Sequence, residues 1–381
     1  MIFETRLLSP ALVGENASLR AGLRLKDLGC NKAFIIYDKG IKAARLPDKI
    51  VENIEKLGIK TIHYDGVLPD PPDYMVEEAA EIGRKEAVDA IVAIGGGSTL
   101  DTAKAVRILL VNPPPIRKYY GNDKAPELGP PLILIPTTAG TGSEVTSVAV
   151  LTNTHSNKKT APFGKNCIAT LAIVDPVLTL GMPPAITAAT GMDAFSHAAE
   201  AITSSKETPV SDLLAKEAIA LIVKSLPNAV ENGSDIQARY DMIYASMLAG
   251  YAFNDAMVHL GHSIAHTLGS LFHVHHGTAC GIALPEVISH VAPVIPEKVK
   301  LVGIAMGVKM YKRDSPKTIG LKVRDAIRAF NKTIGLPSLK EYITESDIDR
   351  IAADSVAGGV FCPNRATLDE ISQMLYNAYS L

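Results

Sequence analysis

The stretch Val88–Leu110 reads VDAIVAIGGGSTLDTAKAVRILL, and it largely decides the fold of this chain. Its first part, DAIVAI, is a short run of apolar and β-branched residues, which is typical of a buried strand. Three glycines and a serine follow, and TLDTAKAVRILL then has the spacing of a helix. A strand that passes through a glycine turn directly into a helix is the unit from which parallel α/β sheets are built.

The same alternation continues on both sides of this stretch. Short apolar runs predict buried strands, and helical patterns with charged outer faces lie between them. The predicted strands are Lys32–Asp38, Thr61–Val67, Val88–Ile94 and Pro131–Thr138, and the predicted helices are Ile41–Leu57, Tyr74–Glu86 and Thr99–Leu110. Alternation of this kind indicates parallel strands with helices on both faces of the sheet.

The pattern changes after Met182-Pro183-Pro184. Beyond this point almost all of the regular pattern is helical, with almost no strand signal. The predicted helices are Ile186–Thr203, Val210–Lys224, Asp235–Phe253, Met257–Leu268, Pro316–Thr333 and Thr367–Tyr379. We therefore expect an α/β domain with a parallel sheet over residues 1–182 and an all-helical domain over residues 183–381.

Composition limits the class of protein and its partners. The 381 residues are 47% hydrophobic and 20% charged, which is typical of a globular chain with two domains. The net charge of -2 provides no basic field for nucleic acid or an anionic membrane. Aspartate and prolines interrupt the most apolar stretch, residues 170–192, so no membrane span is expected.

The location of the protein is predicted from its N-terminus and its cysteines. The first residues, MIFETRLLSP, lack the charged start and apolar centre of a signal peptide. The four cysteines are scattered and form no CxxC pair, which favours free thiols in a reducing compartment. We expect a cytoplasmic protein that binds neither nucleic acid nor membrane.

Two loops in the first half favour a nucleotide ligand. Gly95-Gly96-Gly97-Ser98 follows a strand and precedes a helix, so its backbone N–H groups can approach a phosphate at a helix N-terminus. A second loop, PTTAGTGSE at residues 136–144, adds hydroxyl groups after another strand. Either loop alone is explained equally well as a flexible turn. Two such loops at strand ends in one domain favour nucleotide binding.

Asp38 ends the strand KAFIIYD and bears on the choice of cofactor. A carboxylate there can accept hydrogen bonds from an adenosine ribose and repel a 2′-phosphate, which favours NAD over NADP. Its alternative role is to cap the following helix. The common fingerprint, GxGxxG about 20 residues before such an acid, is absent because the glycine turn follows Asp38 in the chain. An ordinary Rossmann arrangement is therefore not expected in detail.

Histidines are concentrated in the second half. Six of the ten lie between His259 and His276. His262 and His266 are four residues apart and share a helix face, and so do Asp193 and His197 on an earlier helix. Two such pairs can converge on one divalent transition metal. We interpret the following histidines as ordinary core or surface residues: His63, His155, His259, His273 and His290.

Four segments together carry a resemblance to a known family. GGGSTLDTAK, PTTAGTGSEVT, MPPAITAATGMDAFSHAAEA and GHSIAHTLGSLFHVHHG resemble, in order and spacing, motifs of the iron-containing (group III) alcohol dehydrogenases. That family includes lactaldehyde, 1,3-propanediol and butanol oxidoreductases. The resemblance covers nearly the whole chain and weakens after Val291. It implies an N-terminal dinucleotide-binding domain and a helical, metal-binding catalytic domain. It also implies Fe²⁺ with Zn²⁺ as an alternative, NAD with NADP as an alternative, and a homodimer or larger homo-oligomer.

The resemblance also assigns site residues. The implied metal ligands are Asp193, His197, His262 and His276. His266 corresponds to a histidine beside the substrate that either supports the metal ligands or acts as a proton relay, and Phe253 to the wall of the substrate cleft. The implied cofactor-binding positions are Asp38, Gly96, Gly97, Ser98, Asp101, Thr137, Thr138 and Lys159.

The chain departs from the family at two places. His275 stands where the family often has proline before the last ligand, but Gly277 follows His276 as glycine follows the ligand in the family. Asp70-Pro71-Pro72 stands where the family often has Asn-Pro-Thr. We expect His276 to be the ligand, and the extra carboxylate of Asp70 to disturb contacts near the cofactor.

The implied reaction is hydride transfer between NAD(P) and a primary alcohol or diol, or its aldehyde. The absence of Lys and Arg between Arg239 and Lys298 favours a small neutral substrate. One alternative is a zinc polyol dehydrogenase of the glycerol type, although such sites use one Asp and two His. A second is a lyase resembling dehydroquinate synthase, which needs a basic clamp for its substrate. A non-enzymatic metal-binding protein leaves both loops and Asp38 unexplained.

Overall fold

The computed structural model describes residues 9–156 and 158–381, which form two compact units. The α/β unit comprises residues 9–138 and 142–180. The helical unit comprises residues 139–141 and 181–381.

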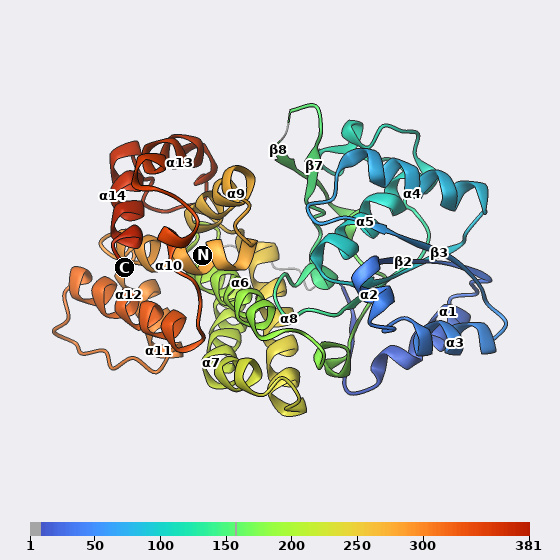
Figure 1. The fold of residues 1–381 in the computed structure, drawn as a ribbon, viewed down its shortest axis with the longest axis horizontal. Helices are drawn as coiled ribbons and strands as arrows, with labels where there is room; N and C mark the ends of the chain where they lie inside the picture. The colour runs from blue at the N-terminus through green and yellow to red at the C-terminus, as the bar shows by residue number, and fades with distance from the viewer. Residues whose placement is uncertain (1–8, 157) are drawn as a thin grey trace. The chain divides into compact units, whose positions relative to one another are not determined.

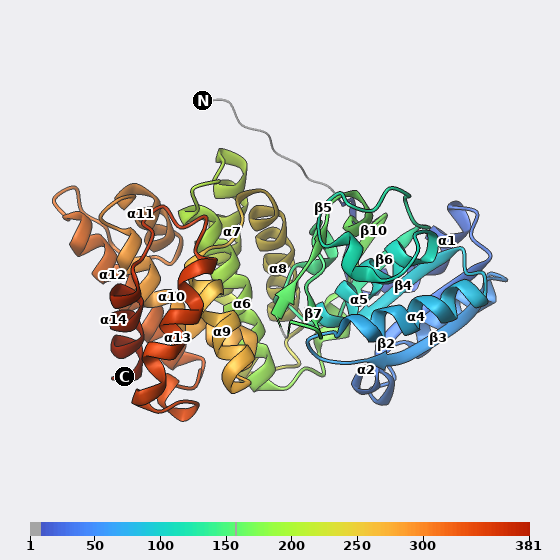
Figure 2. The ribbon, with the colours of Figure 1, turned by 90° about the horizontal axis from the view of Figure 1, so that it is seen from above.

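The α/β unit is built on a six-stranded sheet in which every strand pairing is parallel. The spatial order of the strands is β1 (Ala11–Val13), β10 (Leu171–Val174), β6 (Leu132–Pro136), β4 (Ala90–Gly95), β2 (Lys32–Asp38) and β3 (Lys60–Val67). Figure 2 shows β6, β4, β2 and β3 following one another across the sheet. The central strand β4 is buried along its whole length, which accounts for its continuous apolar sequence.

Helices cover both faces of this sheet (Figure 1). Alternate residues of each strand point to opposite faces, so β2 contributes Phe34 and Ile36 to one core and Ile35 to the other. The first core is completed by α4 (Asp73–Lys85) and α5 (Gly97–Val111), and the second by α1 (Ala21–Asp27) and α3 (Asp48–Lys56). The predicted α/β domain with a parallel sheet is confirmed.

Several predictions of local structure were incomplete. The predicted helix Ile41–Leu57 is wrong, since two helices, α2 (Lys39–Ala43) and α3, are separated around the buried Pro47. Strands β1 and β10 were not predicted because they are only three and four residues long. Two short two-stranded ladders complete the unit: β5 (Gly121–Asn122) with β9 (Pro162–Phe163), and β7 (Leu151–Asn153) with β8 (Lys158–Thr160).

Parallel strands bring the two predicted nucleotide loops to one edge of the sheet. Because β2, β4 and β6 are neighbours, their carboxyl ends lie side by side. Asp38 ends β2, the glycine turn follows β4, and Thr137 follows β6. The backbone N–H of Thr137 donates to the carbonyl of Gly95 over 3.0 Å, which joins the two loops at their origin.

The second loop is also tied to helix α5. The buried Lys104 of α5 donates three hydrogen bonds to the second loop and to the residues directly after it. The acceptors are Ser143 Oγ (2.8 Å), Thr146 Oγ1 (3.1 Å) and the carbonyl of Val148 (2.7 Å). Asp101, one turn earlier, accepts from Ser143 Oγ (2.6 Å) and from the N–H of Val150 (3.0 Å). Helix α5 therefore positions both loops, one at its N-terminus and the other along its side.

The helical unit is arranged around α6 (Pro184–Thr203), which is buried along nearly its whole length. Helix α6 packs against four helices, α7, α8, α10 and α11. The remaining helices are α7 (Pro209–Glu231), α8 (Ile236–Ala256), α9 (Leu260–Phe272), α10 (His276–Val291), α11 (Pro296–Ala305), α12 (Pro316–Thr333), α13 (Ile348–Ser355) and α14 (Leu368–Tyr379). Among the described residues, no helix is long and apolar enough to cross a membrane.

The predicted all-helical half is confirmed, with changes at some boundaries. The helix expected to begin at Met257 begins at Leu260, because Met257 adopts a positive φ of 64° where α8 ends. Helix α9 then ends at Phe272, and His273 follows with a positive φ of 56°. Helix α10 was not predicted, and the internal Pro285 weakens its helical pattern.

We predict that Lys104→Met destabilises the α/β unit by about 2–4 kcal/mol, because three buried hydrogen bonds of a charged donor are lost. Urea denaturation followed by circular dichroism measures the free energy of unfolding. Lys26→Met is the matched control, since Lys26 is exposed on α1, and a change within about 0.5 kcal/mol is expected there. Equal losses in the two variants would contradict this role of Lys104.

Candidate functional site

Four polar side chains of the helical unit gather around one carboxylate oxygen. Asp193 and His197 lie one turn apart on α6, His262 lies on α9, and His276 is the first residue of α10. Asp193 Oδ1 is 3.5 Å from His276 Nε2, 3.9 Å from His262 Nε2 and 3.9 Å from His197 Nδ1. Three separate helices thus direct one carboxylate and three imidazoles at the same point.

Three of these atoms are buried without a hydrogen-bond partner: Asp193 Oδ1, His197 Nδ1 and His262 Nε2. Buried polar atoms are nearly always paired, so a cluster of this kind requires a reason. Imidazole nitrogens and a carboxylate oxygen are the usual ligands of divalent transition metals. Ligands at about 2.1 Å from one cation lie about 3.4 Å apart in a tetrahedral site, close to the separations observed here. These residues fit a metal ion.

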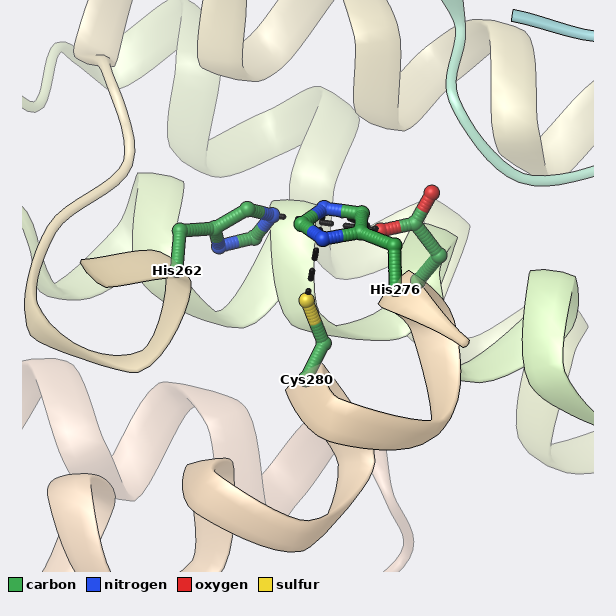
Figure 3. Close-up of side chains that lie close together, drawn as sticks. His262, His276 and Cys280 are labelled. Carbon is green, nitrogen blue, oxygen red and sulfur yellow. Dashed lines mark hydrogen bonds and ion pairs between the residues drawn. The ribbon is translucent and has the colours of Figure 1, made fainter. Parts of the chain in front are cut away.

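The sulfur of Cys280 lies beside this cluster and was missed by sequence reasoning. Figure 3 shows His276 and Cys280 on the same helix, α10, with the ring of His262 of α9 next to them. Cys280 Sγ is 3.6 Å from His276 Nε2, and the donor atoms of Asp193, His262, His276 and Cys280 all lie within 4.8 Å of one another. The signal was available, because Cys280 follows His276 by four residues and shares its helix face.

His197 lies on another side of the cluster, outside that group of four. Its ring stacks on the ring of His262, with 4.6 Å between centroids. Burial lowers the pKa of His197 to about 4. Burial likewise lowers the pKa of His276 well below its ordinary value, although Asp193 opposes the shift. Both imidazoles are therefore neutral at pH 7, which is the form that binds a metal.

The pKa of the Cys280 thiol is shifted in the opposite direction, upwards. Burial, together with the carboxylates of Asp193 and Glu200, raises the pKa of Cys280 well above its ordinary value. A protonated thiol donates hydrogen bonds but is a poor metal ligand. In the metal-free site Cys280 is therefore a protonated thiol, and a cation would have to displace this proton before the sulfur could bind it.

A second buried carboxylate, Glu200, was also missed. It lies seven residues after Asp193 on α6 and accepts a hydrogen bond from His262 Nδ1. Burial alone would raise the pKa of Glu200, but the charges of His259 and His262 and the hydrogen bonds to them hold it below its ordinary value. His259 is buried and hydrogen-bonded to Thr203, in agreement with its interpretation as a core residue.

The other predicted residues of this unit lie around the cluster. His266 stacks on His276 with 5.1 Å between ring centroids, and Phe253 stacks on His197 with 4.2 Å. His273 and His275 are exposed, whereas His276 is partly buried and close to Asp193. The geometry therefore favours His276 over its neighbours as a ligand.

The glycine turn of the α/β unit forms the beginning of α5. Gly96 is the N-cap of this helix, and Gly97 and Ser98 are its first residues. A Cβ on Gly95 would lie 2.5 Å from Thr99 Oγ1, so the turn requires glycine there. Backbone N–H groups at a helix N-terminus, without side chains in front of them, are suited to bind a phosphate.

The threonines after β6 lie next to this turn. Thr138 side-chain atoms are 3.4 Å from the position of a Cβ on Gly96. The hydroxyl of Thr137 is buried and has no hydrogen-bond partner in the described chain. The residues of this edge therefore fit a nucleotide, and the unpaired Thr137 hydroxyl lies among them.

Asp38, Asp101 and Lys159 have protein partners. Asp38 Oδ1 accepts the N–H of Ile41 over 2.9 Å and caps α2, which was its alternative interpretation. Both oxygens of Asp101 bind the second loop, so Asp101 positions that loop. Lys159 on β8 forms an ion pair with Asp70, the carboxylate that departs from the family pattern.

Comparisons with known proteins agree with this arrangement. A family model described as iron-containing alcohol dehydrogenase matches residues 9–176, and its C-terminal counterpart matches residues 187–379. The chain is 35% identical to the NAD-dependent methanol dehydrogenase of Bacillus methanolicus, covering 97% of each protein. It is 37% identical to the 1,3-propanediol dehydrogenase of Citrobacter freundii, covering 96% of each.

Solved structures give the same result. A crystal structure of 1,3-propanediol oxidoreductase superposes with a TM-score of 0.95 at 35% identity, over 99% of this chain and 100% of that one. The alcohol dehydrogenase of Oenococcus oeni superposes with a TM-score of 0.94 at 32% identity, again over 99% and 100%. The chain belongs to the iron-containing alcohol dehydrogenase family and is a metal-dependent alcohol dehydrogenase that uses NAD(P).

Proposed function

We propose that residues 183–381 form the catalytic domain and hold Fe²⁺, or alternatively Zn²⁺, through Asp193, His197, His262 and His276. The observation that carries this proposal is the set of three buried, unpaired atoms Asp193 Oδ1, His197 Nδ1 and His262 Nε2, with His276 Nε2 beside them. When bound, the metal ion supplies a Lewis acid that lowers the pKa of the alcohol, and NAD(P) supplies the hydride acceptor. The protein residues hold the substrate and move its proton.

We propose that residues 1–182 form the dinucleotide-binding domain. The backbone of Gly96, Gly97 and Ser98 binds the pyrophosphate at the N-terminus of α5, and the hydroxyls of Thr137 and Thr138 complete that site. Asp38 binds the adenosine ribose and thereby favours NAD. Support comes from the common sheet edge that these residues share and from the unpaired Thr137 hydroxyl. Lys159 contributes positive charge, which Asp70 partly neutralises.

The proposed substrate is a small neutral primary alcohol or diol, or the corresponding aldehyde. Phe253 provides an apolar surface beside His197, and residues 240–297 contain no Lys or Arg to bind an anionic substrate. The named relatives act on methanol and 1,3-propanediol, which agrees with this class. The zinc polyol dehydrogenase and the dehydroquinate-synthase-like lyase gain no comparable support.

We also propose a homodimer or larger homo-oligomer in the cytoplasm. The four cysteines are buried and free, which favours a reducing compartment. The oligomeric state rests on the family resemblance alone. Light scattering on the purified protein measures it directly.

Anaerobic reconstitution tests the proposed activity. The metal-stripped protein is loaded with Fe²⁺ or Zn²⁺ and assayed with primary alcohols, diols and glycerol, each with NAD and NADP. Activity restored by metal on primary alcohols or 1,3-diols is the expected result. Activity confined to glycerol with Zn²⁺ would favour the polyol dehydrogenase instead.

The ligand assignment predicts which histidines control metal content. His262→Ala and His276→Ala should each lose most of the bound metal and nearly all activity, because each removes a donor from a buried site. His273→Ala and His275→Ala are matched controls and should retain the metal, since both side chains are exposed. Elemental analysis of the purified variants measures this. Full occupancy in His276→Ala with loss in His275→Ala would reverse the assignment.

The cofactor assignment predicts that Asp38→Gly changes the cofactor preference. Removing the carboxylate should raise the ratio of kcat/KM for NADP to that for NAD by about tenfold or more, which is about 1.4 kcal/mol of relative free energy. Asp27→Asn is the control, because it removes an exposed carboxylate of α1 outside the proposed site and should leave the ratio unchanged. Equal use of both cofactors by the unmodified protein would remove the basis of this prediction.

His266 is proposed to carry the substrate proton on an imidazole nitrogen. His266→Ala should retain the metal but lower kcat by about 10²–10⁴-fold, with an altered pH profile. Metal content, kcat and KM are recorded together from pH 5 to 9. Lost metal would make His266 a ligand, and an unchanged kcat with a raised KM would reduce its role to packing.

A further inference from the structure

Glu200 is the most enclosed charged group beside the proposed metal ligands. Its side chain is 0% exposed. One carboxylate oxygen, Oε1, accepts the backbone N–H of Gly261 over 2.6 Å. The other, Oε2, accepts the N–H of His259 (3.1 Å), the N–H of His262 (3.3 Å) and the ring Nδ1–H of His262 (2.5 Å). A residue of α6 thus binds the beginning of α9 at four points.

These contacts replace a local helix cap. The N-cap residue of α9, His259, makes no side-chain capping hydrogen bond. The first N–H groups of a helix need acceptors, and a negative charge there is favourable. Glu200 supplies both the acceptor oxygens and the negative charge from α6. It therefore determines where α9 begins relative to α6.

The contact with the imidazole also determines its tautomer. A carboxylate only accepts hydrogen bonds, so Nδ1 of His262 carries a proton, and Nε2 is the nitrogen that offers a lone pair when the ring is neutral. Nε2 is the atom that lies 3.9 Å from Asp193 Oδ1 and is buried without a partner. The hydrogen bond that His262 Nδ1–H donates to Glu200 therefore turns Nε2 of His262 towards the cluster.

We propose that Glu200 is a positioning residue of the metal centre, which holds His262 in the orientation and tautomer required for binding. The proposal rests on the proposed function, because it takes His262 as a ligand. Carboxylates that hydrogen-bond to ligating histidines typically change metal affinity by about 10–100-fold when removed. Glu200 itself touches no substrate and is not a catalytic residue.

A glycine supports the same contact. A Cβ on Gly261 would lie 2.8 Å from Glu200 Oε1, too close for both to remain in place. The absence of a side chain at position 261 therefore lets the carboxylate approach the backbone of α9. This gives a second way to displace Glu200 without changing any proposed ligand.

The test compares Co²⁺ affinity in variants of the full-length protein. Each metal-stripped variant is titrated with Co²⁺ against a competing chelator, and the visible absorption bands of bound Co²⁺ are recorded. Glu200→Gln should raise the Kd by about 10–100-fold and alter the bands. The amide has one acceptor oxygen, and in one orientation its NH₂ group forces the proton of His262 onto Nε2.

Two further variants separate positioning from general destabilisation. Thr203→Val removes the hydrogen bond between the Thr203 hydroxyl and His259 Nε2 and leaves the four hydrogen bonds of Glu200 in place, so it costs stability but should leave the Co²⁺ Kd unchanged. Gly261→Ala should raise the Kd, and it keeps the proposal testable if Glu200→Gln does not fold. Thermal unfolding of each metal-free variant is measured in parallel.

The outcomes distinguish this proposal from the ligand assignment. An unchanged Co²⁺ Kd in folded Glu200→Gln or Gly261→Ala, with weak binding in His262→Ala, would overturn the role of Glu200 alone. A Thr203→Val variant as weak as Glu200→Gln would reduce Glu200 to a structural role. Unchanged binding in His262→Ala would show that the ligand assignment is wrong, and the inference would fail with it.

Discussion

The burial of the Asp193 carboxylate is the constraint on which the helical unit depends. A carboxylate removed from water is unstable by several kcal/mol unless hydrogen bonds or positive charge compensate. Here Oδ1 has no hydrogen-bond partner and is surrounded by three imidazole nitrogens at 3.5–3.9 Å. The arrangement is electrostatically incomplete within the protein, and the proposed divalent cation would complete it. Because α6 carries this carboxylate, the neighbouring helices must pack around α6 to keep the carboxylate buried.

The two carboxylates of α6 have different partners and different roles. Asp193 faces the unpaired nitrogens, whereas Glu200 is saturated by donors from the beginning of α9. Seven residues separate them, so both lie on the same side of one rigid helix. Because α6 holds one proposed ligand pair and also sets the position of His262, the geometry of the centre depends on helix packing rather than on flexible loops. The α/β unit uses α5 in a comparable way, with Lys104 and Asp101 holding the second loop.

The sequence predicted the parts of the structure that follow from local pattern. Alternation of strands and helices predicted the parallel sheet, and the i,i+4 spacing of Asp193 and His197 placed both on one helix face. Glu200 was missed because its significance is tertiary: it matters through contacts with the beginning of another helix. Cys280 was missed although it follows His276 by four residues, because only the tertiary structure places His276 beside Asp193. The break at Pro47 and the brief strands β1 and β10 were missed because short segments carry little periodic signal. Asp38 shows a further limit. A helix cap and a ribose contact both require an aspartate at this position, so the sequence does not distinguish the two roles.

The central claim is that one cation joins Asp193 to three histidines and excludes the neighbouring thiol. A crystal structure of the Fe²⁺-loaded protein, with anomalous difference density measured across the iron absorption edge, tests it most directly. The account predicts one peak about 2.0–2.2 Å from Asp193, His197, His262 and His276, with Cys280 Sγ clearly farther away. A peak bonded to Cys280 Sγ in place of His197, or located away from Asp193, would contradict it.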